Sequence, residues 1–282
     1  QVYRSMYWSG SQLDRPRLGA ELLFQYHKLE KGLSMPGPRR FFGRDPALRV
    51  AQLVMRWKHV GLPCDDPTYV GANEALAAYR SRLASMENVQ IGDLTSAIDR
   101  ALRDCSERNE ALSTPCVVER RLEPKTASEV MKQLASERRS VRNFKSDPVP
   151  REAIEYAVRV AQFSPSACNR QAIAAYMIED REEIDALLAF QNGNRGFGHL
   201  VPLLVAVTAD ERCFFDATER HEPYVDGGLF AMSLVLGLQA KGVSSCCLNW
   251  CVPPAVDRKA HERAGVPMPR RIVMLIAVGY AA

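Results

Sequence analysis

The chain has 282 residues, of which 46% are hydrophobic and 25% charged, and this composition is typical of a globular protein with a sizeable core. The formal net charge is only +4 and the basic residues are spread along the chain, so bulk charge gives no indication of nucleic-acid binding. No run of eighteen apolar residues occurs, and residues 1–10 lack the basic and apolar segments of a signal peptide. We therefore expect no nucleic-acid partner, no membrane span and no signal peptide.

Residues 1–120 have the periodicity of amphipathic helices and no convincing alternating strand. Leu18, Leu22, Leu29 and Leu33 recur at helical steps, and Gly32 or Pro36 is expected to end this first helix. Similar apolar stripes follow over residues 47–57 and 75–83. We expect an all-helical N-terminal extension over residues 1–120.

Eight cysteines are scattered along the chain, without a CxxC pair or a histidine at metal-ligand spacing. In a chain of this length and composition, such thiols indicate a reduced, cytoplasmic protein without a metal site. They are Cys64, Cys105, Cys116, Cys168, Cys213, Cys246, Cys247 and Cys251.

From Pro124 onward the sequence alternates short helical patterns with apolar runs of strand length. The runs 173–178, 201–208 and 272–278 predict strands, and the first and last are apolar enough to be buried on both faces. Residues 151–162 predict a helix that follows Pro150. We expect a domain of the α+β class over residues 121–282.

A second long helix is expected to begin at Asp226, with that side chain capping its N-terminus. Apolar or small residues continue nearly all round it to Leu238, so a second subunit is expected to cover part of it. A strand that runs into a loop follows over residues 243–250.

An arginine-rich stretch lies near the start of the domain over residues 121–282, from Arg138 to Phe144. Arginine suits bidentate contact with phosphate or carboxylate, and extended backbone would place Arg138, Ser140 and Arg142 on one side. A solvated basic turn is the alternative interpretation. The loop Ser164-Pro165-Ser166-Ala167-Cys168-Asn169-Arg170-Gln171 offers backbone amides and small polar side chains to a ligand, or is simply a polar helix-to-strand connection.

Taken together, these segments resemble the nitroreductase-like flavoproteins. Residues 138–144 resemble the RRSxRxF opening of that family, and residues 164–171 resemble its SPSxxNxQ loop. Residues 226–249 resemble its interface helix and flavin-edge loop, and residues 272–280 resemble its last strand. The resemblance covers residues 124–282. It implies a nitroreductase-like sheet with packed helices, preceded here by the helical extension, and a homodimer with two FMN molecules at the subunit interface.

The resemblance also implies roles for the arginine stretch. Arg138 and Arg139 would face the FMN phosphate and ribityl chain. Ser140 would face the ribityl or pyrimidine edge, and Arg142 the pyrimidine oxygen O2 near N1. A fixed guanidinium there favours the anionic hydroquinone. Members of that family usually continue past the last strand to a basic residue on the phosphate, whereas nothing follows Ala282 here. Either Arg138 and Arg139 hold the phosphate alone, or such a tail lies beyond these 282 residues.

Two further segments complete the implied site. The partner subunit would contribute Ser166, Ala167, Asn169 and Gln171. The flavin ring would lie along Cys246, Cys247 and Leu248, with a backbone amide near N5.

The implied activity is that of an FMN-dependent oxidoreductase in which NAD(P)H reduces the flavin and a small-molecule acceptor reoxidises it, in a ping-pong reaction without a catalytic side chain. A flavin- or ligand-binding protein without turnover, acting in a biosynthetic complex, and a nucleic-acid contact by the arginines are the alternatives. The extension either folds over the flavin and sets the substrate, through Tyr26, Lys28, Arg39, Arg40, Phe41 and Phe42, or is an independent docking or solubility domain.

Overall fold

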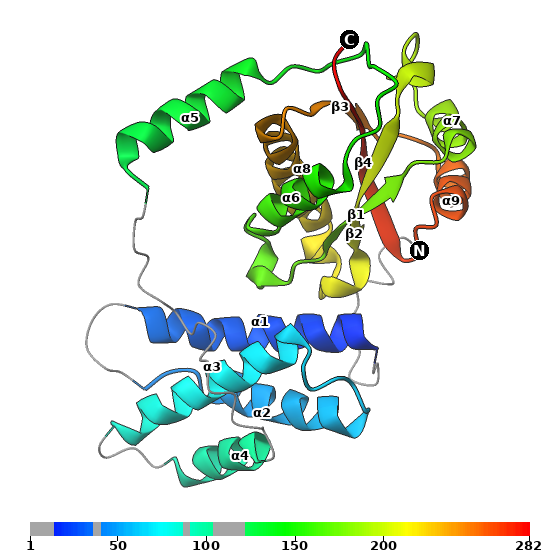
Figure 1. The fold of residues 1–282 in the computed structure, drawn as a ribbon. Coiled ribbons are helices and arrows are strands. Elements are labelled where there is room, and N and C mark those ends of the chain that lie inside the picture. Colours follow the sequence, from blue (N-terminus) through cyan, green and yellow to red (C-terminus); the bar gives the residue numbers. More distant parts are fainter. Residues whose placement is uncertain (1–13, 36–40, 87–90, 104–121) are drawn as a thin grey trace. The chain divides into compact units, whose positions relative to one another are not determined.

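The computed structural model describes residues 14–35, 41–86, 91–103 and 122–282. The chain forms two compact units (Figure 1). The helical unit comprises Tyr7–Glu119 with Cys168–Arg170, and the α+β unit contains Arg120–Ala167 and Gln171–Ala282. The boundary expected between residues 120 and 121 lies outside the described residues. In the described part of the chain, no helix has both the length and the apolar character needed to cross a membrane.

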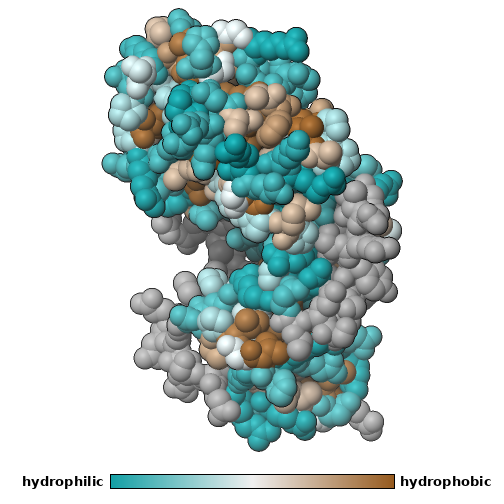
Figure 2. Space-filling model, turned by 90° about the vertical axis from the view of Figure 1, so that its right-hand side faces the viewer, coloured by the Kyte–Doolittle hydropathy of each residue, from teal (hydrophilic) through white to brown (hydrophobic). Residues whose placement is uncertain are grey.

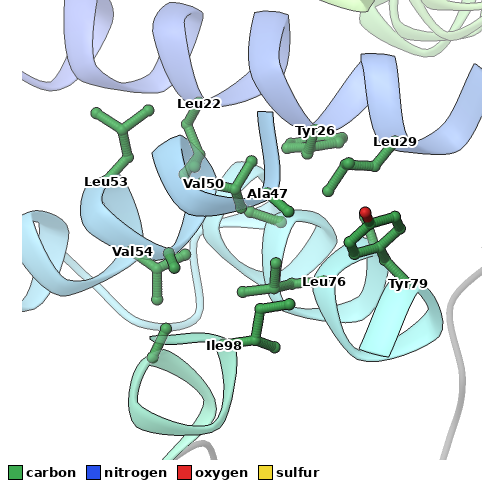
Figure 3. Close-up of a cluster of buried hydrophobic side chains, with 14 of the residues drawn as sticks. Leu22, Tyr26, Leu29, Ala47, Val50, Leu53, Val54, Leu76, Tyr79 and Ile98 are labelled. Atoms are coloured by element: carbon green, nitrogen blue, oxygen red, sulfur yellow. The ribbon is translucent and has the colours of Figure 1, made fainter. Parts of the chain in front are cut away.

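The helical unit is built around an apolar core shared by α1 (Arg15–Ser34), α2 (Arg44–His59), α3 (Pro67–Ala84) and α4 (Gly92–Leu102). Figure 3 shows their side chains meeting between the helices, and Trp57 and Tyr79 are fully buried. Asp14 and Asp66 cap α1 and α3, because their side chains accept hydrogen bonds from backbone N–H groups of the first turn. The expected helices are present, and α4 is an additional one.

Gly32 does not end α1, contrary to one expectation. The helix continues to Ser34, and the alternative stop, Pro36, lies outside the described residues. Gly32 packs against the ring of Phe42, where an added Cβ would lie 2.0 Å from a ring carbon. The glycine therefore serves this close approach inside the helix and does not terminate it.

The α+β unit has an antiparallel sheet in the order β1-β2-β4-β3. The strands are β1 (Ile173–Ile178), β2 (Leu203–Asp210), β3 (Ser244–Asn249) and β4 (Arg270–Gly279). The α+β class is confirmed, although β2 begins and ends two residues later than predicted. Burial on both faces holds for most of the central strand β4. It is wrong for β1, an edge strand that is mostly half-buried.

Helices cover both faces of this sheet (Figure 1). α6 (Arg151–Gln162) and α8 (Glu222–Ala240) pack on one face, and α7 (Arg181–Phe190) and α9 (Pro254–Arg263) lie on the other. The bounds of α6 match the prediction. Figure 2 views the molecule from its right-hand side in Figure 1, and there hydrophilic residues are mixed with small apolar patches.

Two helices differ from a simple packed layer. α8 begins at Glu222, four residues before Asp226, so the expected capping role of Asp226 is wrong. Pro223 lies in the first turn, where its missing N–H is tolerated, and this lets the helix start early. The helix α5 (Pro124–Glu137) has no buried residue within its own chain.

Candidate cofactor-binding site

The arginine stretch follows α5 and runs beside the edge strand β3. The Val141 N–H donates to the Ser245 carbonyl at 3.1 Å, and Ser140 forms a β-bridge with Ser245. Further along, Phe144 bridges to Ala281 and its ring is buried in the core under α7 and α9. Backbone pairing and one buried ring therefore fix the stretch against the sheet.

The three guanidinium groups of this stretch differ in their partners. Arg139 Nη1 donates to the carbonyls of Ser136 and Arg138, so it closes the C-terminal end of α5. The guanidinium groups of Arg138 and Arg142 make no hydrogen bond or ion pair with any described residue, and Arg142 is exposed. Arg138 and Arg142 are thus the two arginines available for an anion.

The strand β3 separates the three residues predicted to lie along one ligand. Cys246 and Leu248 are buried in the core under α7 and α9, opposite Ala277 and Leu275. Cys247 lies on the other face of the strand and is exposed. Successive side chains of a strand point to opposite faces, so Cys247 is the one side chain of the three that is open to a ligand.

Arg138 lies close enough to Cys247 to affect its ionisation. Cys247 is exposed as a residue, but its sulfur is partly removed from water. This burial raises the pKa of the Cys247 thiol. The adjacent Cys246 raises that pKa further, whereas the charge of Arg138 acts to lower it. The structure therefore brings the first arginine of the stretch beside the open face of β3, next to a thiol that is neutral at pH 7.

A hollow opens beside the end of the same stretch. Its volume is about 430 Å³, and its lining includes Lys145, Ser244 and Tyr280. The Lys145 N–H donates to the Tyr280 carbonyl at 2.9 Å, so this lysine is held next to the last strand. The arginine pattern in the sequence does not single out Lys145, although its position one residue after Phe144 could have indicated it.

The loop Ser164–Gln171 has an unusual backbone. Cys168, Asn169 and Gln171 have φ values of 51°, 55° and 50°, in the left-handed region that residues other than glycine rarely adopt. Each such residue costs about 1–2 kcal/mol and persists only where surrounding contacts impose it. One of those contacts is internal, because the Gln171 N–H donates to Ser166 Oγ at 3.0 Å.

Further contacts tie the loop to α8. The Ala167 N–H lies 3.1 Å from both carboxylate oxygens of Asp226, whose side chain is buried. Ser164 Oγ donates to Ser233 Oγ at 2.7 Å. A cavity of about 140 Å³ lies between this loop and α8. Asp226 was expected to cap a helix and not to anchor this loop; an acid inside an otherwise apolar helix was the signal for the second role.

A single α+β unit does not bring all the predicted residues together. The loop leads into β1 at one edge of the sheet, and the arginine stretch runs along β3 at the other. Arg138, Ser140 and Cys247 are therefore neighbours. The loop residues Ser166, Ala167, Asn169 and Gln171 lie at the opposite edge of the same sheet.

The residues of the extension that were expected to face a ligand differ in how far they are buried within the helical unit. Tyr26 is buried in the helical core, where loss of water is the main cause that raises its pKa, so the expectation that it faces a ligand is wrong. Phe42 is half-buried against the same core. Lys28 and Phe41 are exposed, and Arg39 and Arg40 lie outside the described residues.

Comparison with known proteins gives one family. Residues 135–193 match the model of the Nitroreductase family. Solved structures similar to part of this chain include an FMN-dependent nitroreductase from Clostridium difficile, with 21% identity, coverage of 52% of this chain and 86% of that chain, and a TM-score of 0.46. A candidate NADH oxidase from Clostridium acetobutylicum has 26% identity, coverage of 53% and 87%, and a TM-score of 0.47. A nitroreductase family protein from Streptococcus pneumoniae has 20% identity, coverage of 54% and 90%, and a TM-score of 0.47. No curated protein matches the chain.

Proposed function

We propose that the chain is an oxidoreductase that binds FMN, a proposal supported by the match of residues 135–193 to the Nitroreductase family model. The proposal also includes the order of the reaction, in which NAD(P)H and a small-molecule acceptor use the same site in turn, in a ping-pong reaction. The observation that carries the proposal lies in the matched segment. Arg138 and Arg142 project from a stretch that is fixed along β3, and neither guanidinium has a partner among the described residues.

The residues present fit an anionic, flat cofactor. A guanidinium group binds phosphate or a ring oxygen through charge-assisted hydrogen bonds. Arg138 and Lys145 would hold the phosphate end, and Arg142 would hold the pyrimidine edge. Ser140 and the exposed face of β3 at Cys247 would line the ring. When bound, FMN would supply reversible hydride chemistry, and a cation at its pyrimidine edge would favour the reduced, anionic form.

Arg139 has a different part in this proposal from the one expected for it. Its guanidinium is engaged by the carbonyl groups at the end of α5, so it would orient the start of the arginine stretch. The predicted contacts of Cys246 and Leu248 are likewise reduced to backbone contacts, because their side chains face the core. These changes leave the proposed site with fewer side chains but the same charge pattern.

The proposal includes a homodimer in which the loop Ser164–Gln171 serves the partner's site. Its support is the position of this loop at the sheet edge opposite the arginine stretch, together with an apolar stripe on α8 next to the loop. Val225, Leu229 and Met232 recur at helical spacing on α8 and are 52%, 43% and 47% exposed. α5 adds exposed Val130 and Met131. A second copy of the chain would remove these side chains from water.

Spectroscopy of the purified protein tests the activity. We expect a yellow protein that releases one FMN per chain, and anaerobic NADH or NADPH should bleach the flavin absorbance. Retained FMN without bleaching by either nucleotide would favour a flavin-binding protein without turnover. A protein that retains no flavin after reconstitution would contradict the proposal. Sedimentation tests the dimer separately, and a flavin-bound monomer at low micromolar concentration would contradict that part.

A further inference from the structure

The chain is held tightly where β3 ends. Gln191, which is buried at the C-terminal end of α7, donates from Nε2 to the side-chain oxygen of Asn249 at 2.8 Å and to its carbonyl at 3.2 Å. The Asn194 amide in turn donates to Gln191 Oε1 at 3.1 Å. A partly buried amide network in which each member has partners fixes a backbone position. This network therefore fixes Asn249, which lies two positions after Cys247.

The next residue, Trp250, is held from the other side by α9. Its indole Nε1–H donates to Asp257 Oδ1 at 2.7 Å. Trp250 packs as a half-buried side chain against the core under α7 and α9. Asp257 therefore sets the position of the indole ring, and with it the direction in which the chain leaves β3.

The other oxygen of Asp257 faces a buried histidine one turn further along α9. His261 is 4% exposed, and its Nε2 lies 3.8 Å from Asp257 Oδ2. Its Nδ1 lies 3.0 Å from the Val266 carbonyl, which can only accept, so the proton of a neutral ring belongs on Nδ1. Nε2 is then a buried lone pair without a hydrogen-bond partner among the described residues.

We propose that His261 is a proton-sensitive positioning residue, which acts through Asp257 on Trp250 and so on the end of β3. In the neutral ring, the Nε2 lone pair faces a carboxylate oxygen, and the two repel. Protonation places an N–H donor in the same gap, and the carboxylate is drawn toward the ring. Asp257 then shares its charge between two donors, and its hydrogen bond to the Trp250 indole weakens.

Other charged groups around the ring do not provide a competing partner. Asp257 is the one acidic residue of the described chain with an oxygen within 4.0 Å of His261. The remaining charged residues of α9 are exposed, and they are Arg258, Lys259, Glu262 and Arg263. On α7, which packs on the same core, Arg181, Glu182, Glu183 and Asp185 are exposed as well. On β4, Arg270 and Arg271 are engaged with Asp210 and Glu211.

This coupling matters for function if the face of β3 at Cys247 binds the flavin, and in that respect it rests on the proposed function. Because the charge change of histidine side chains ordinarily falls between about pH 5 and 8, acidification over that range is the perturbation that tests the anchor at Trp250. A looser end of β3 lowers the affinity for FMN. Coupling between two sites commonly changes affinity by about fivefold or more, so we expect a loss of about fivefold on acidification that depends on His261.

The indole N–H signals of ¹⁵N-labelled protein test the coupling without any cofactor. The chain has three tryptophans, and Trp250→Phe assigns the signal of interest. Between about pH 8 and pH 5 the Trp250 indole proton should move to lower chemical shift, as its hydrogen bond weakens. Trp57 is the internal control, because its indole donates to the Pro63 carbonyl and it is buried in the helical core. The pH response of Trp250 should disappear in His261→Gln and in Asp257→Asn, which retains an acceptor for the indole.

Titration of FMN into the apoprotein tests the link to the site at both pH values. The fivefold loss of affinity should occur in the wild type and be absent in His261→Gln. A Trp250 signal that does not respond to pH, or that responds equally in both variants, would overturn the proposal. An indole response without any His261-dependent change in FMN affinity would overturn the regulatory part. If no FMN binds at any pH, the proposed function fails, and the indole titration still decides the coupling.

Discussion

Replacing Asp226 by alanine should release the loop Ser164–Gln171 from α8. In the wild type, both carboxylate oxygens lie 3.1 Å from the Ala167 N–H, and the side chain is 3% exposed. The alanine variant removes both acceptors, so the half-buried Ala167 N–H loses its hydrogen bonds to this carboxylate. The nearby residues with positive φ depend on such contacts, so the loop should gain freedom.

The magnitude follows from the kind of bond that is lost. A buried hydrogen bond to a charged group contributes about 1.5–3 kcal/mol. Because about 1.4 kcal/mol corresponds to a tenfold change in an equilibrium constant, local opening of the loop should become roughly 10- to 100-fold more frequent. Ser233→Ala removes the neutral bond from Ser164, which contributes about 0.5–1.5 kcal/mol, so its effect should stay below roughly tenfold.

Hydrogen exchange measured by mass spectrometry is the assay for this prediction. Peptides that span residues 163–172 should lose protection in Asp226→Ala by the factor given above, and less in Ser233→Ala. Peptides from β2 serve as the internal control, since this strand is buried throughout. Unchanged protection of the loop in Asp226→Ala, with the variant folded, would refute the anchoring role of Asp226.

Two further predictions concern stability. Gly237→Ala should lower the free energy of unfolding by on the order of 1 kcal/mol. The added Cβ would lie 2.8 Å from the Cα of Ala157, and this overpacking outweighs the gain in helix propensity. Gly228→Ala on the same helix meets no atom within 4 Å and should gain about 0.5–1 kcal/mol; equal denaturation midpoints for the two variants would refute this packing. Desolvation raises the pKa of Tyr79 to about 12, so its stabilising contribution is complete below the unfolded value of 10.0 and is lost as the pH rises from there to about 12. Tyr79 should therefore account for about 2–3 kcal/mol of the loss in unfolding free energy that urea unfolding shows over that range. The loss should be smaller in Tyr79→Phe, and an identical loss in that variant would contradict the assignment.

Several elements of the fold could be predicted from sequence because local signals and tertiary packing agree. The helix α6 begins after Pro150 and buries Ala153, Ile154, Ala157 and Ala161, which share one helical face. The opposite orientation of Cys246 and Cys247 also follows from the two-residue period of a strand. That Cys246, Cys247 and Leu248 all lie along one ligand therefore stays a prediction, in which Cys246 and Leu248 contribute backbone groups.

Other features depend on contacts between residues distant in sequence, and no local pattern determines them. Gly32 lies within α1 because the ring of Phe42 requires the space of its missing Cβ. Asp226 is bound to the Ala167 N–H, 59 positions away, and not to the first turn of its own helix. The half-buried state of β1 follows from its place at the edge of the sheet, which its apolar sequence does not indicate.

The central claim is that the arginine stretch along β3 binds FMN. Titration of FMN into apoprotein tests it most directly, with Arg142→Ala compared against Arg151→Ala. Arg151 is the matched control, since it is an exposed arginine that pairs with Glu155 on α6. We expect one FMN per chain in the wild type, no change in Arg151→Ala, and an affinity roughly tenfold to a hundredfold lower in Arg142→Ala, as the loss of a charge-assisted bond of about 1.5–3 kcal/mol predicts. An affinity in Arg142→Ala equal to that of the wild type, or no FMN binding by the wild type, would contradict the claim.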